Sequence, residues 1–489
     1  MSHHHHGLPS SNVTAGFIDL ATFDELDKYL YGGQDATAYF VRETRKATWF
    51  TQVPVALSRA TGQPDFGSNW SVAISRAGDY LLHAWLRVTT PQVAIAAPAV
   101  GALATAPMKT IRWTRNFMHN LVQECQVTFN DLVAARFDSY HLDFWTAFTV
   151  PAGKRNGYDN MIGNLEELIT PQTLLPSVTL NLPLPLFFAR DSGVALPTAA
   201  LPYNEMRLNF GFRNWSELLI VDEFHIPPDL IDADDSVHVW KHSRPAQPAD
   251  LAGGLALTLT NCNVWANYAI VSNDERKRMA CAPRDILIEQ VQSAPRQTFT
   301  PRSNANQQFD IRFSHAIKVL FFAVRNRTCE SEHSNYTCHQ PTISVRMHED
   351  GPKYSIDFTA GGKATDPIGQ TSLIYENTHR LAQMGSDYFS LVNPYYSAPV
   401  IPAVSGYHMY SYSLNFIALD PMGSTNYGKL TNVSISPEAS ESAIASQVAP
   451  EDRRGQRCPG RHNNYEFITT AVNNNIIRIS GGALGFPVL

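Results

Sequence analysis

The stretch "EMRLNFGF", residues 205–212, alternates apolar side chains with polar or small ones. In an extended chain the apolar set shares one face: Met206, Leu208, Phe210 and Phe212. The same two-residue period recurs in "VTLNLPL" (178–184), "QFDIRFS" (308–314) and "TNVSI" (431–435). Strands with one buried face and one wetter face are typical of packed antiparallel sheets. The pattern therefore predicts an all-β protein.

The composition fits many strands joined by turns and long loops. The chain has 489 residues, of which 17% are charged and 11% aromatic, with 31 Pro. A helical bundle would need more Lys, Glu and Arg on its outer faces, so the composition disfavours that class. The formal net charge of −6 argues against direct nucleic-acid binding, which would need a dominant basic face.

A polar run divides the chain near its middle. The run "SNDERKRMACAPRD" (272–285) separates strand-like "NVWANYAIV" from strand-like "ILIEQVQ". At this length two β-rich domains are expected, each large enough for an eight-stranded sandwich. We predict an N-terminal arm (1–33), a first domain (34–282) and a second domain (283–489). Long inserted loops are expected at 91–109, 223–254, 327–370 and 436–463.

Few segments have helical signals, and the helices are expected to be short. The best candidate is "TFDELDKYLYGG" (22–33), where Thr22 and Glu25 are spaced as a capping box and Gly32-Gly33 can end the helix. A second short helix is predicted in "FDSYHLDFWTAF" (137–148).

The motifs that carry enzymatic or metal chemistry are missing. "TAGGKAT" (359–365) fails as a phosphate loop, because Ala364 stands where a magnesium-binding hydroxyl belongs. Neither Gly-X-Ser-X-Gly, His-Glu-X-X-His nor Cys-X-X-Cys occurs. "DADDS" (232–236) lacks the Gly and Glu of a calcium loop, and His238 and His242 lie in a Pro-bounded loop with no shared helical face. We predict no catalytic residue, no cofactor and no metal ligand.

The cysteines do not form a disulfide framework, because six in a chain of this length are too few. The sequence leaves open whether Cys329 and Cys338 are bonded, and whether His3 to His6 are native or an expression remnant. No secretory leader is recognisable, so the Asn-X-Ser/Thr sites are expected to be unmodified. These sites are Asn12, Asn69, Asn214, Asn326, Asn335 and Asn432.

Several segments, taken in order, resemble the major capsid proteins of iridoviruses, which are large icosahedral DNA viruses. They are "GFIDLATFDELDKYLYGG" (16–33), "IRWTRNFMHNLV" (111–122), "LPLPLFFARDSGVALPTAALPYNEMRL" (182–208), "DIRFSHAIKVLFF" (310–322) and "NNNIIRISGGALGFPVL" (473–489). Together they span nearly the whole chain. The resemblance is therefore specific, although each segment alone would be weak.

The resemblance implies a fold of two consecutive eight-stranded jelly rolls with short helices and long inserted loops. It implies a structural virion protein with no enzymatic activity, assembled in the host-cell cytoplasm. Three copies would form a pseudo-hexagonal homotrimer that tiles an icosahedral shell around an inner membrane. The expected partners are neighbouring capsomers, minor capsid proteins and, through the N-terminal arm, the inner membrane.

Two further segments gain an interpretation from the resemblance. "DPMGSTNYGKL" (420–430) resembles a sharp corner of the family's second domain, so Gly423, Ser424 and Asn426 are expected to shape a turn rather than to bind phosphate. "VNPYYSAPVIP" (392–402), with Tyr395 and Tyr396, is a candidate strip between copies. Plain core packing of that strip is an equally open interpretation.

Two alternatives to a shell protein belong to other functional classes. The first is a β-sandwich that binds glycans for host attachment, for which Trp240 in the 223–254 loop is the residue to probe. The second, weaker one is a sandwich hydrolase with a carboxylate pair, although no pair stands out in the sequence.

Overall fold

The computed structural model describes residues 10–97, 108–224, 237–238, 241–302, 307–348, 350–358, 365–448 and 463–487. The chain divides into an N-terminal arm, which ends at Trp49, and a compact body, which begins at Phe50. The predicted domain limits at 33/34 and 282/283 stay predictions. No described helix is both long and apolar enough to cross a lipid bilayer.

The N-terminal arm contains two short helices, α1 (Val13–Ala21) and α2 (Glu25–Leu30), and no residue of either helix is buried. The helix predicted within 22–33 is confirmed as α2, but its predicted cap of Thr22 and Glu25 is wrong, and α1 was not predicted. Thr22 instead ends α1, and Asp24 caps α2. The Asp24 carboxylate accepts from the backbone N–H of Asp27 at 3.1 Å, and the Asp27 carboxylate accepts from that of Asp24 at 3.2 Å. Two aspartates therefore form the reciprocal cap that Thr and Glu were expected to form.

Two sheets of the body are built from residues 50–271. One contains β1 (Phe50–Ala56), β15 (Asn261–Val271), β4 (Tyr80–Thr89) and β10 (Thr179–Pro183), in that spatial order. The other contains β2 (Arg59–Thr61), β3 (Asn69–Ala73), β11 (Met206–Phe212), β7 (Val122–Phe129) and β8 (Leu132–Asp138). If β2 is set aside and the other eight strands are numbered in chain order, the two sheets read 1-8-3-6 and 2-7-4-5.

The residues from 284 onward repeat this topology. One sheet contains β16 (Arg284–Ser293), β27 (Tyr465–Ser480), β19 (Ala316–Asn326) and β24 (His408–Ser411). The other contains β18 (Phe309–Asp310), β26 (Val433–Ala439), β22 (Ile368–Tyr375) and β23 (Thr378–Gly385). Their strand order is again 1-8-3-6 and 2-7-4-5, and the pairs are antiparallel. This is the jelly-roll arrangement, so the predicted fold of two consecutive eight-stranded jelly rolls is confirmed.

The alternating segments behave as predicted, with one exception. In β11 every second side chain is buried, from Met206 to Phe212. The segment 308–314 keeps alternating burial as far as Phe313, but only Phe309 and Asp310 are paired as a strand. Past them the Ile311 N–H still bonds to the Val433 carbonyl, and then the chain turns at His315, whose φ is 65°. The strand is shorter than its pattern suggests because the turn removes its last residues from the sheet.

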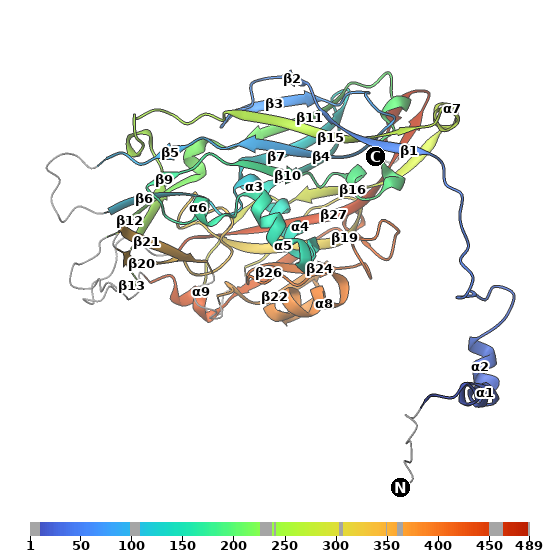
Figure 1. The fold of residues 1–489 in the computed structure, drawn as a ribbon. Coiled ribbons are helices and arrows are strands. Elements are labelled where there is room, and N and C mark those ends of the chain that lie inside the picture. Colours follow the sequence, from blue (N-terminus) through green and yellow to red (C-terminus); the bar gives the residue numbers. More distant parts are fainter. Residues whose placement is uncertain are drawn as a thin grey trace, which may run out of the picture. The chain divides into compact units, whose positions relative to one another are not determined.

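Small sheets and helices connect the strands of the two rolls (Figure 1). The short strands are β5 (Val93–Ala94), β6 (Met108–Trp113), β9 (Leu174–Leu175), β12 (Leu219–Phe224), β13 (Val237–His238), β14 (Lys241–Pro245), β17 (Gln297–Phe299), β20 (Thr342–His348), β21 (Gly351–Asp357), β25 (Thr425–Asn426) and β28 (Ala483–Gly485). The helices of the body are α3 (Phe117–Leu121), α4 (Ser139–Thr149), α5 (Ala152–Ile162), α6 (Glu166–Ile169), α7 (Asn273–Cys281), α8 (Asn393–Ser397) and α9 (Glu441–Ala445).

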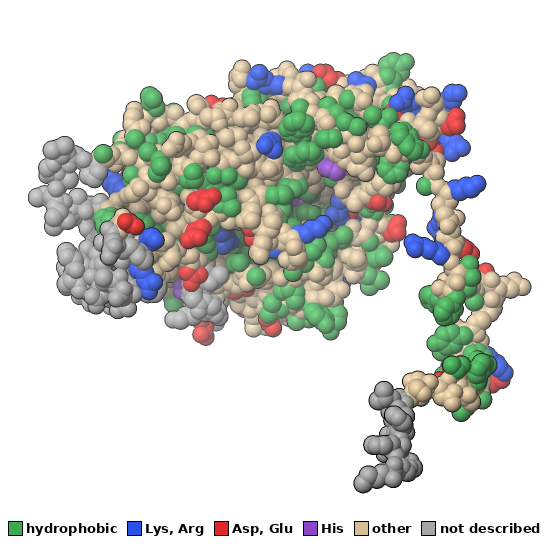
Figure 2. All heavy atoms as spheres, viewed as in Figure 1, with side chains coloured by type: hydrophobic (Ala, Val, Ile, Leu, Met, Phe, Trp, Pro, Cys, Tyr) green, Lys and Arg blue, Asp and Glu red, His purple; other side chains and the backbone are tan. Residues whose placement is uncertain are grey.

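The helix predicted at 137–148 is confirmed as α4. The polar run between the two rolls forms α7, a helix with no buried residue that carries charges of both signs (Figure 2). Arg276 pairs with Asp79 at 2.9 Å, and Arg278 pairs with Glu275 at 3.4 Å. Two of the basic residues in this run, Arg276 and Arg278, are therefore each paired with a carboxylate.

Three apolar clusters fill the compact body. The first lies between the sheets of the first roll and also takes in Ile286, Ile477 and Ile479 of the second roll. The second lies between the sheets of the second roll. The third joins α4 of the first roll to the outer face of the β16-β27-β19-β24 sheet. Strand β19 is thus buried on both faces, which explains its nearly continuous apolar sequence.

Candidate functional site at the junction of the rolls

Within the described residues there is no cluster of three or more His, Cys, Asp or Glu side chains able to hold a metal ion. A Ser-His-Asp group lies in the second roll, where Ser386 Oγ and Asp366 Oδ2 are both 2.7 Å from Nε2 of His408. Because the serine and the carboxylate share one ring nitrogen, they are not arranged as a relay through the imidazole. Buried polar groups do gather where the first roll meets the second. This junction consists of α4, the end of β6 with α3, and the segment 327–341 that follows β19.

Helix α4 holds the two rolls together through two opposite sets of side chains. It starts directly after β8, where the Asp138 carboxylate accepts from the His141 N–H at 2.9 Å. Leu142 lies in the core of the first roll. On the other side Phe148 stacks on Phe321 of β19, with ring centroids 5.6 Å apart. Phe144 and Trp145 contact the same ring, at 6.2 Å and 6.4 Å.

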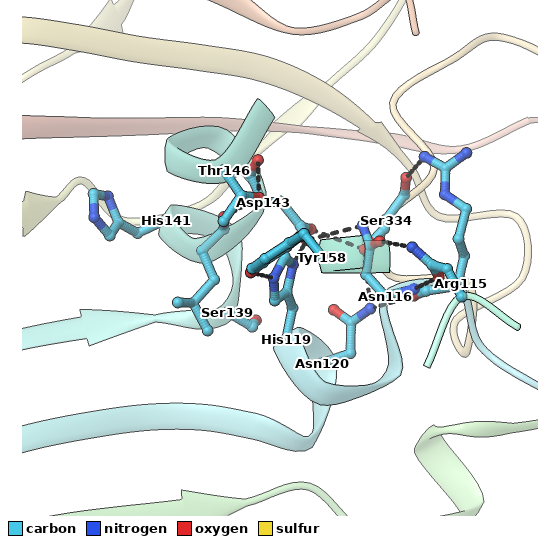
Figure 3. A network of polar contacts seen from close by, with 12 residues as sticks. Arg115, Asn116, His119, Asn120, Ser139, His141, Asp143, Thr146, Tyr158 and Ser334 are labelled. Atoms are coloured by element: carbon cyan, nitrogen blue, oxygen red, sulfur yellow. Dashed lines mark hydrogen bonds and ion pairs between the residues drawn. The ribbon is translucent and has the colours of Figure 1, made fainter. Parts of the chain in front are cut away.

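Asp143 of α4 is the centre of a buried hydrogen-bond network (Figure 3). Its Oδ1 accepts from Asn116 Nδ2 at 3.1 Å and from His119 Nδ1 at 2.8 Å. Its Oδ2 accepts from Ser334 Oγ at 2.8 Å and from the Tyr336 hydroxyl at 2.7 Å. One carboxylate therefore joins two residues of the first roll to two residues of the second, and all its acceptor positions are used.

This network does not place a base directly beside its serine. A nucleophilic serine needs a hydrogen bond to its base, but Ser334 and His119 bind different oxygens of Asp143. His119 Nε2 meets the hydroxyl of Tyr158 instead of a substrate space. Burial raises the pKa of Tyr158 and of Tyr336, so both phenols stay protonated at neutral pH.

A buried ion group forms the second link across the junction. Arg112 of β6 donates from Nε to Asp222 of β12 at 2.7 Å and also binds Glu332 of the 327–341 segment. The Arg112 and Asp222 side chains are inaccessible to solvent, and that of Glu332 is nearly so. Burial would lower the pKa of Arg112, but the charges of Asp222 and Glu332 raise it, so the guanidinium is charged. Removing Arg112 would take away the cation that two buried carboxylates share.

A third link involves β16 and β19 of the second roll. Glu289 of β16 accepts from Lys318 of β19 and from Arg190 of the first roll, the latter at 3.0 Å. The guanidinium of Arg190 also lies over the ring of Trp145 in α4, 4.4 Å from its centroid. Burial lowers the pKa of Lys318 even though Glu289 opposes that effect.

The 327–341 segment belongs to a predicted long loop, and its part in the junction was not anticipated. Ser331 donates to the Ser216 carbonyl at 3.2 Å, and a ring nitrogen of His333 lies 2.9 Å from the Glu217 carbonyl oxygen. The thiol of Cys338 is free, so the structure decides the open question of the Cys329–Cys338 bond against it. Burial raises the pKa of Cys338 to about 11, which keeps the thiol protonated and unreactive.

The predicted corner at 420–430 is confirmed as a turn. Gly423 has a φ of 121°, and a side chain there would meet the Tyr412 carbonyl at 2.7 Å. Asn426 accepts from the Gly428 N–H at 3.0 Å, as an Asx turn requires. Thr425 and Asn426 form β25, which pairs with β19, so the residues of the corner add a short strand to the β16-β27-β19-β24 sheet.

The candidate strip at 392–402 is helical at its start. It contains α8, which is preceded by a π-helical turn (Tyr388–Val392), and Tyr395 and Tyr396 are exposed there. These two side chains are therefore not core residues of a single chain. Their predicted role between copies stays a prediction.

Some other predicted candidates are separated or undescribed. Trp240 and the segment 232–236 lie outside the described residues, as does most of 359–365. His238 and His242 fall in β13 and β14, which belong to different sheets. The residues that hold the junction, Arg112, Asp143 and Glu332, were not singled out by any motif. Their partners are 24 to 220 residues away in the sequence, so no short spacing could reveal them.

The sequence matches known proteins over both jelly rolls. Residues 38–271 match a family model described as "Major capsid protein N-terminus", and residues 275–485 match one described as "Large eukaryotic DNA virus major capsid protein". The chain is 58% identical over 493 residues to the major capsid protein of Costelytra zealandica iridescent virus, covering 99% of this chain and 100% of the relative. It is 58% identical over 486 residues to that of Tipula iridescent virus, covering 97% of each chain.

A solved structure supports the same fold at much lower sequence identity. The quasi-atomic model of the PBCV-1 virus capsid superposes with a TM-score of 0.68 and 19% identity, covering 92% of this chain and 100% of that chain. At that identity the likeness concerns the fold alone. Agreement of sequence and fold over nearly the full length shows that the match is not limited to one domain.

Proposed function

The chain belongs to the family of large eukaryotic DNA virus major capsid proteins, and from this membership we propose how its two jelly rolls build a shell. Its role is structural, as a component of the virion capsid. In our proposal three copies form a homotrimer with a pseudo-hexagonal outline. Such trimers tile an icosahedral shell around an inner membrane.

The observation that carries the proposal is the repeated strand order of the two rolls in one rigid chain. Both rolls read 1-8-3-6 and 2-7-4-5, and the buried junction fixes one against the other. Three copies around an axis then supply six wedges of the same topology. A closed ring of this kind presents similar edges in six directions, which suits a nearly flat lattice.

The mass of the purified chain in solution tests this proposal. Light scattering during gel filtration should give three times the chain mass of 54.3 kDa, and negative-stain images should show hexagonal outlines. A chain that remains monomeric at every concentration would contradict the trimer. The measurement needs no partner, so it tests the chain's own capacity to associate.

The N-terminal arm supports a second part of the proposal, contact with minor capsid proteins or the inner membrane. Its apolar side chains are exposed, among them Phe17, Leu26 and Tyr29. Exposed apolar groups in such number are typical of a segment that is covered by a partner. Deletion of residues 1–33 should leave the trimer intact and reduce particle assembly in infected cells. Normal assembly without the arm would contradict this role.

The proposal includes neither an active site nor a cofactor, a metal ion or direct contact with the genome. The Asp143 carboxylate of the junction accepts four hydrogen bonds from its neighbours, and the chain carries a formal net charge of −6. Assembly in the host cytoplasm agrees with the protonated, unpaired thiol of Cys338, since reducing conditions preserve such thiols.

A further inference from the structure

The two jelly rolls each carry a helical insert at the same place in their topology. In the first roll α4 follows the fifth strand, β8, and precedes the sixth, β10. In the second roll the π-helical turn Tyr388–Val392 and α8 follow the fifth strand, β23, and precede the sixth, β24. The second insert, residues 388–397, is therefore the topological counterpart of α4.

The first insert buries two sides. Leu142 anchors it in its own roll, while Phe144, Trp145 and Phe148 cover the outer face of the other roll's sheet. The ring they cover is Phe321, on the third strand of that sheet, directly opposite Thr470 of the eighth strand. The contact thus lies over the centre of the 1-8-3-6 sheet.

The second insert buries only one side. Phe389 anchors it in its own roll, with its ring centroid 5.2 Å from that of Phe322. On the other side Tyr395 and Tyr396 are 71% and 78% exposed, in edge-to-face contact at 5.1 Å. Leu391 and Val392 are exposed beside them in the chain. In Figure 2 hydrophobic side chains appear at the surface over α8. Among the described residues, none covers the outward side of this insert as the second roll's sheet covers that of α4.

The matching sheet of the first roll has an uncovered aromatic centre. Trp85 on its third strand and Trp265 on its eighth strand are opposite each other, as Phe321 and Thr470 are in the second roll. Their rings stack at 6.4 Å on the outer face and are only partly buried. The indole N–H of Trp265 is shielded from solvent without a hydrogen-bond acceptor, which is a costly state for a single chain. His83 and Arg87 frame the pair and are exposed.

We propose that the second insert of one copy packs on Trp85 and Trp265 of the next copy, repeating between chains the contact that α4 makes within the chain. Tyr395 and Tyr396 take the places of the α4 aromatics, and a tyrosine hydroxyl accepts from the Trp265 indole N–H. The inference rests on the proposed trimer and names its central contact. In a ring of six rolls, the insert of each roll would then pack on the 1-8-3-6 sheet of the next roll. These contacts would lie alternately within one chain and between two chains.

The chemistry of the two surfaces suits this pairing. Tyrosine and tryptophan side chains supply large, rigid contact areas at little cost in side-chain entropy, and they are enriched at the centres of protein interfaces. The contact is heterologous, since an insert meets a sheet rather than another insert. Heterologous contacts close into rings when the rotation between copies allows it, and three copies satisfy six-wedge geometry.

The experiment uses the full chain and a double substitution, Tyr395→Ser with Tyr396→Ser. The matched control is Tyr203→Ser, which removes a similarly exposed tyrosine, 75% accessible, outside both surfaces. Light scattering over a dilution series should show that the double variant raises the trimer dissociation constant at least about 100-fold, the expectation for losing central aromatic anchors. The control should change it by less than about threefold.

A cross-link identifies the partner surface directly. A photoreactive benzoylphenylalanine at position 396 should join two chains, and mass spectrometry should locate the bond in peptides that contain Trp85 or Trp265. If the wild type is a trimer and the double variant is an equally stable trimer, the proposed contact is wrong but the trimer remains. The same holds if the cross-link from position 396 forms to peptides without Trp85 or Trp265. A wild-type chain that never associates overturns the contact and the proposed trimer together.

Discussion

The junction of the two rolls and the N-terminal arm are both rich in aromatic and aliphatic side chains, but only the junction buries them. Phe144 and Phe148 of α4 are fully buried, whereas Phe17 and Phe23 of the arm are exposed. The difference lies in the partner available to each. Helix α4 meets the outer face of a sheet in the same chain, and the described arm residues have no comparable cover. An apolar helix of this protein therefore needs a surface that covers it. For α4 that surface belongs to the same chain, whereas for the arm helices we expect it to belong to another molecule.

The largest loss of unfolding free energy is expected for Arg112→Met, which changes the buried junction rather than the exposed surface. The substitution removes the guanidinium that the buried Asp222 and Glu332 carboxylates share, so a loss of about 3–5 kcal/mol in unfolding free energy is expected. Arg478→Met is the matched control, because Arg478 forms a solvent-exposed pair with Asp285 at 2.8 Å, and its loss should cost far less stability than that of Arg112. Urea unfolding of both variants measures the difference. Equal costs would show that the junction is not held by Arg112.

A second large effect is expected from the apolar side of the junction. Phe144→Ala should lower the unfolding free energy by about 3–4 kcal/mol, since it removes a buried ring and leaves a cavity between the rolls. Unfolding followed by tryptophan fluorescence is suited to this test, because Trp145 lies next to the site. A cost below about 1 kcal/mol would mean that the rolls repack without α4.

A smaller, pH-dependent effect should distinguish the junction by its buried histidines. Burial, with help from the charge of Arg190, lowers the pKa of His141 from 6.5 to about 3. Because the unfolded chain takes up this proton first, the stability that neutral His141 contributes is complete above about pH 6.5 and is lost as the pH falls toward about 3. Between about pH 7.5 and about pH 5 the wild type should lose about 2 kcal/mol more than His141→Phe.

The control for this pH effect is internal. Burial also lowers the pKa of His333, which is present in both proteins and contributes equally to both profiles. Unfolding free energies from urea titrations at the two pH values give the comparison. Parallel pH profiles would show that His141 is hydrated in the folded protein.

The smallest effect is expected in the arm. Phe17→Ala removes the same side chain as Phe144→Ala, but from a helix with no buried residue. The unfolding free energy of the unassembled protein should change by less than about 0.5 kcal/mol, because no packing is lost. A change as large as that of Phe144→Ala would mean that the arm is covered in solution.

Local sequence patterns predicted the structural features that depend on residues close together in the chain, namely strands and turns. The alternation from Met206 to Phe212 predicted a strand with one buried face, and the Gly423 corner was predicted from its turn residues. The arm cap was mistaken because Asp24 with Asp27 and Thr22 with Glu25 have the same spacing, and only the backbone geometry decides between them. Jelly-roll topology entered through family resemblance, since alternation does not determine which strands pair.

The junction could not be predicted, because its groups come from distant parts of the chain. Arg112 and Glu332 are 220 residues apart, and Asp143 and Tyr336 are 193 apart. Each residue taken alone resembles an ordinary surface charge or a core aromatic. Their contacts form only when the two domains pack in one orientation. Local patterns in a single sequence do not reveal that orientation.

Strand β27 completes both halves of the molecule. It pairs with β16 and β19 at the centre of the second roll, while its residues Ile477 and Ile479 enter the core of the first. In chain order β27 follows the other strands of both rolls, so neither half is complete until the ribosome has made it. A product cut short by premature termination or by a protease would lack the segment that both halves require. A chain must therefore contain β27 before either of its halves can take its place in a growing virus particle.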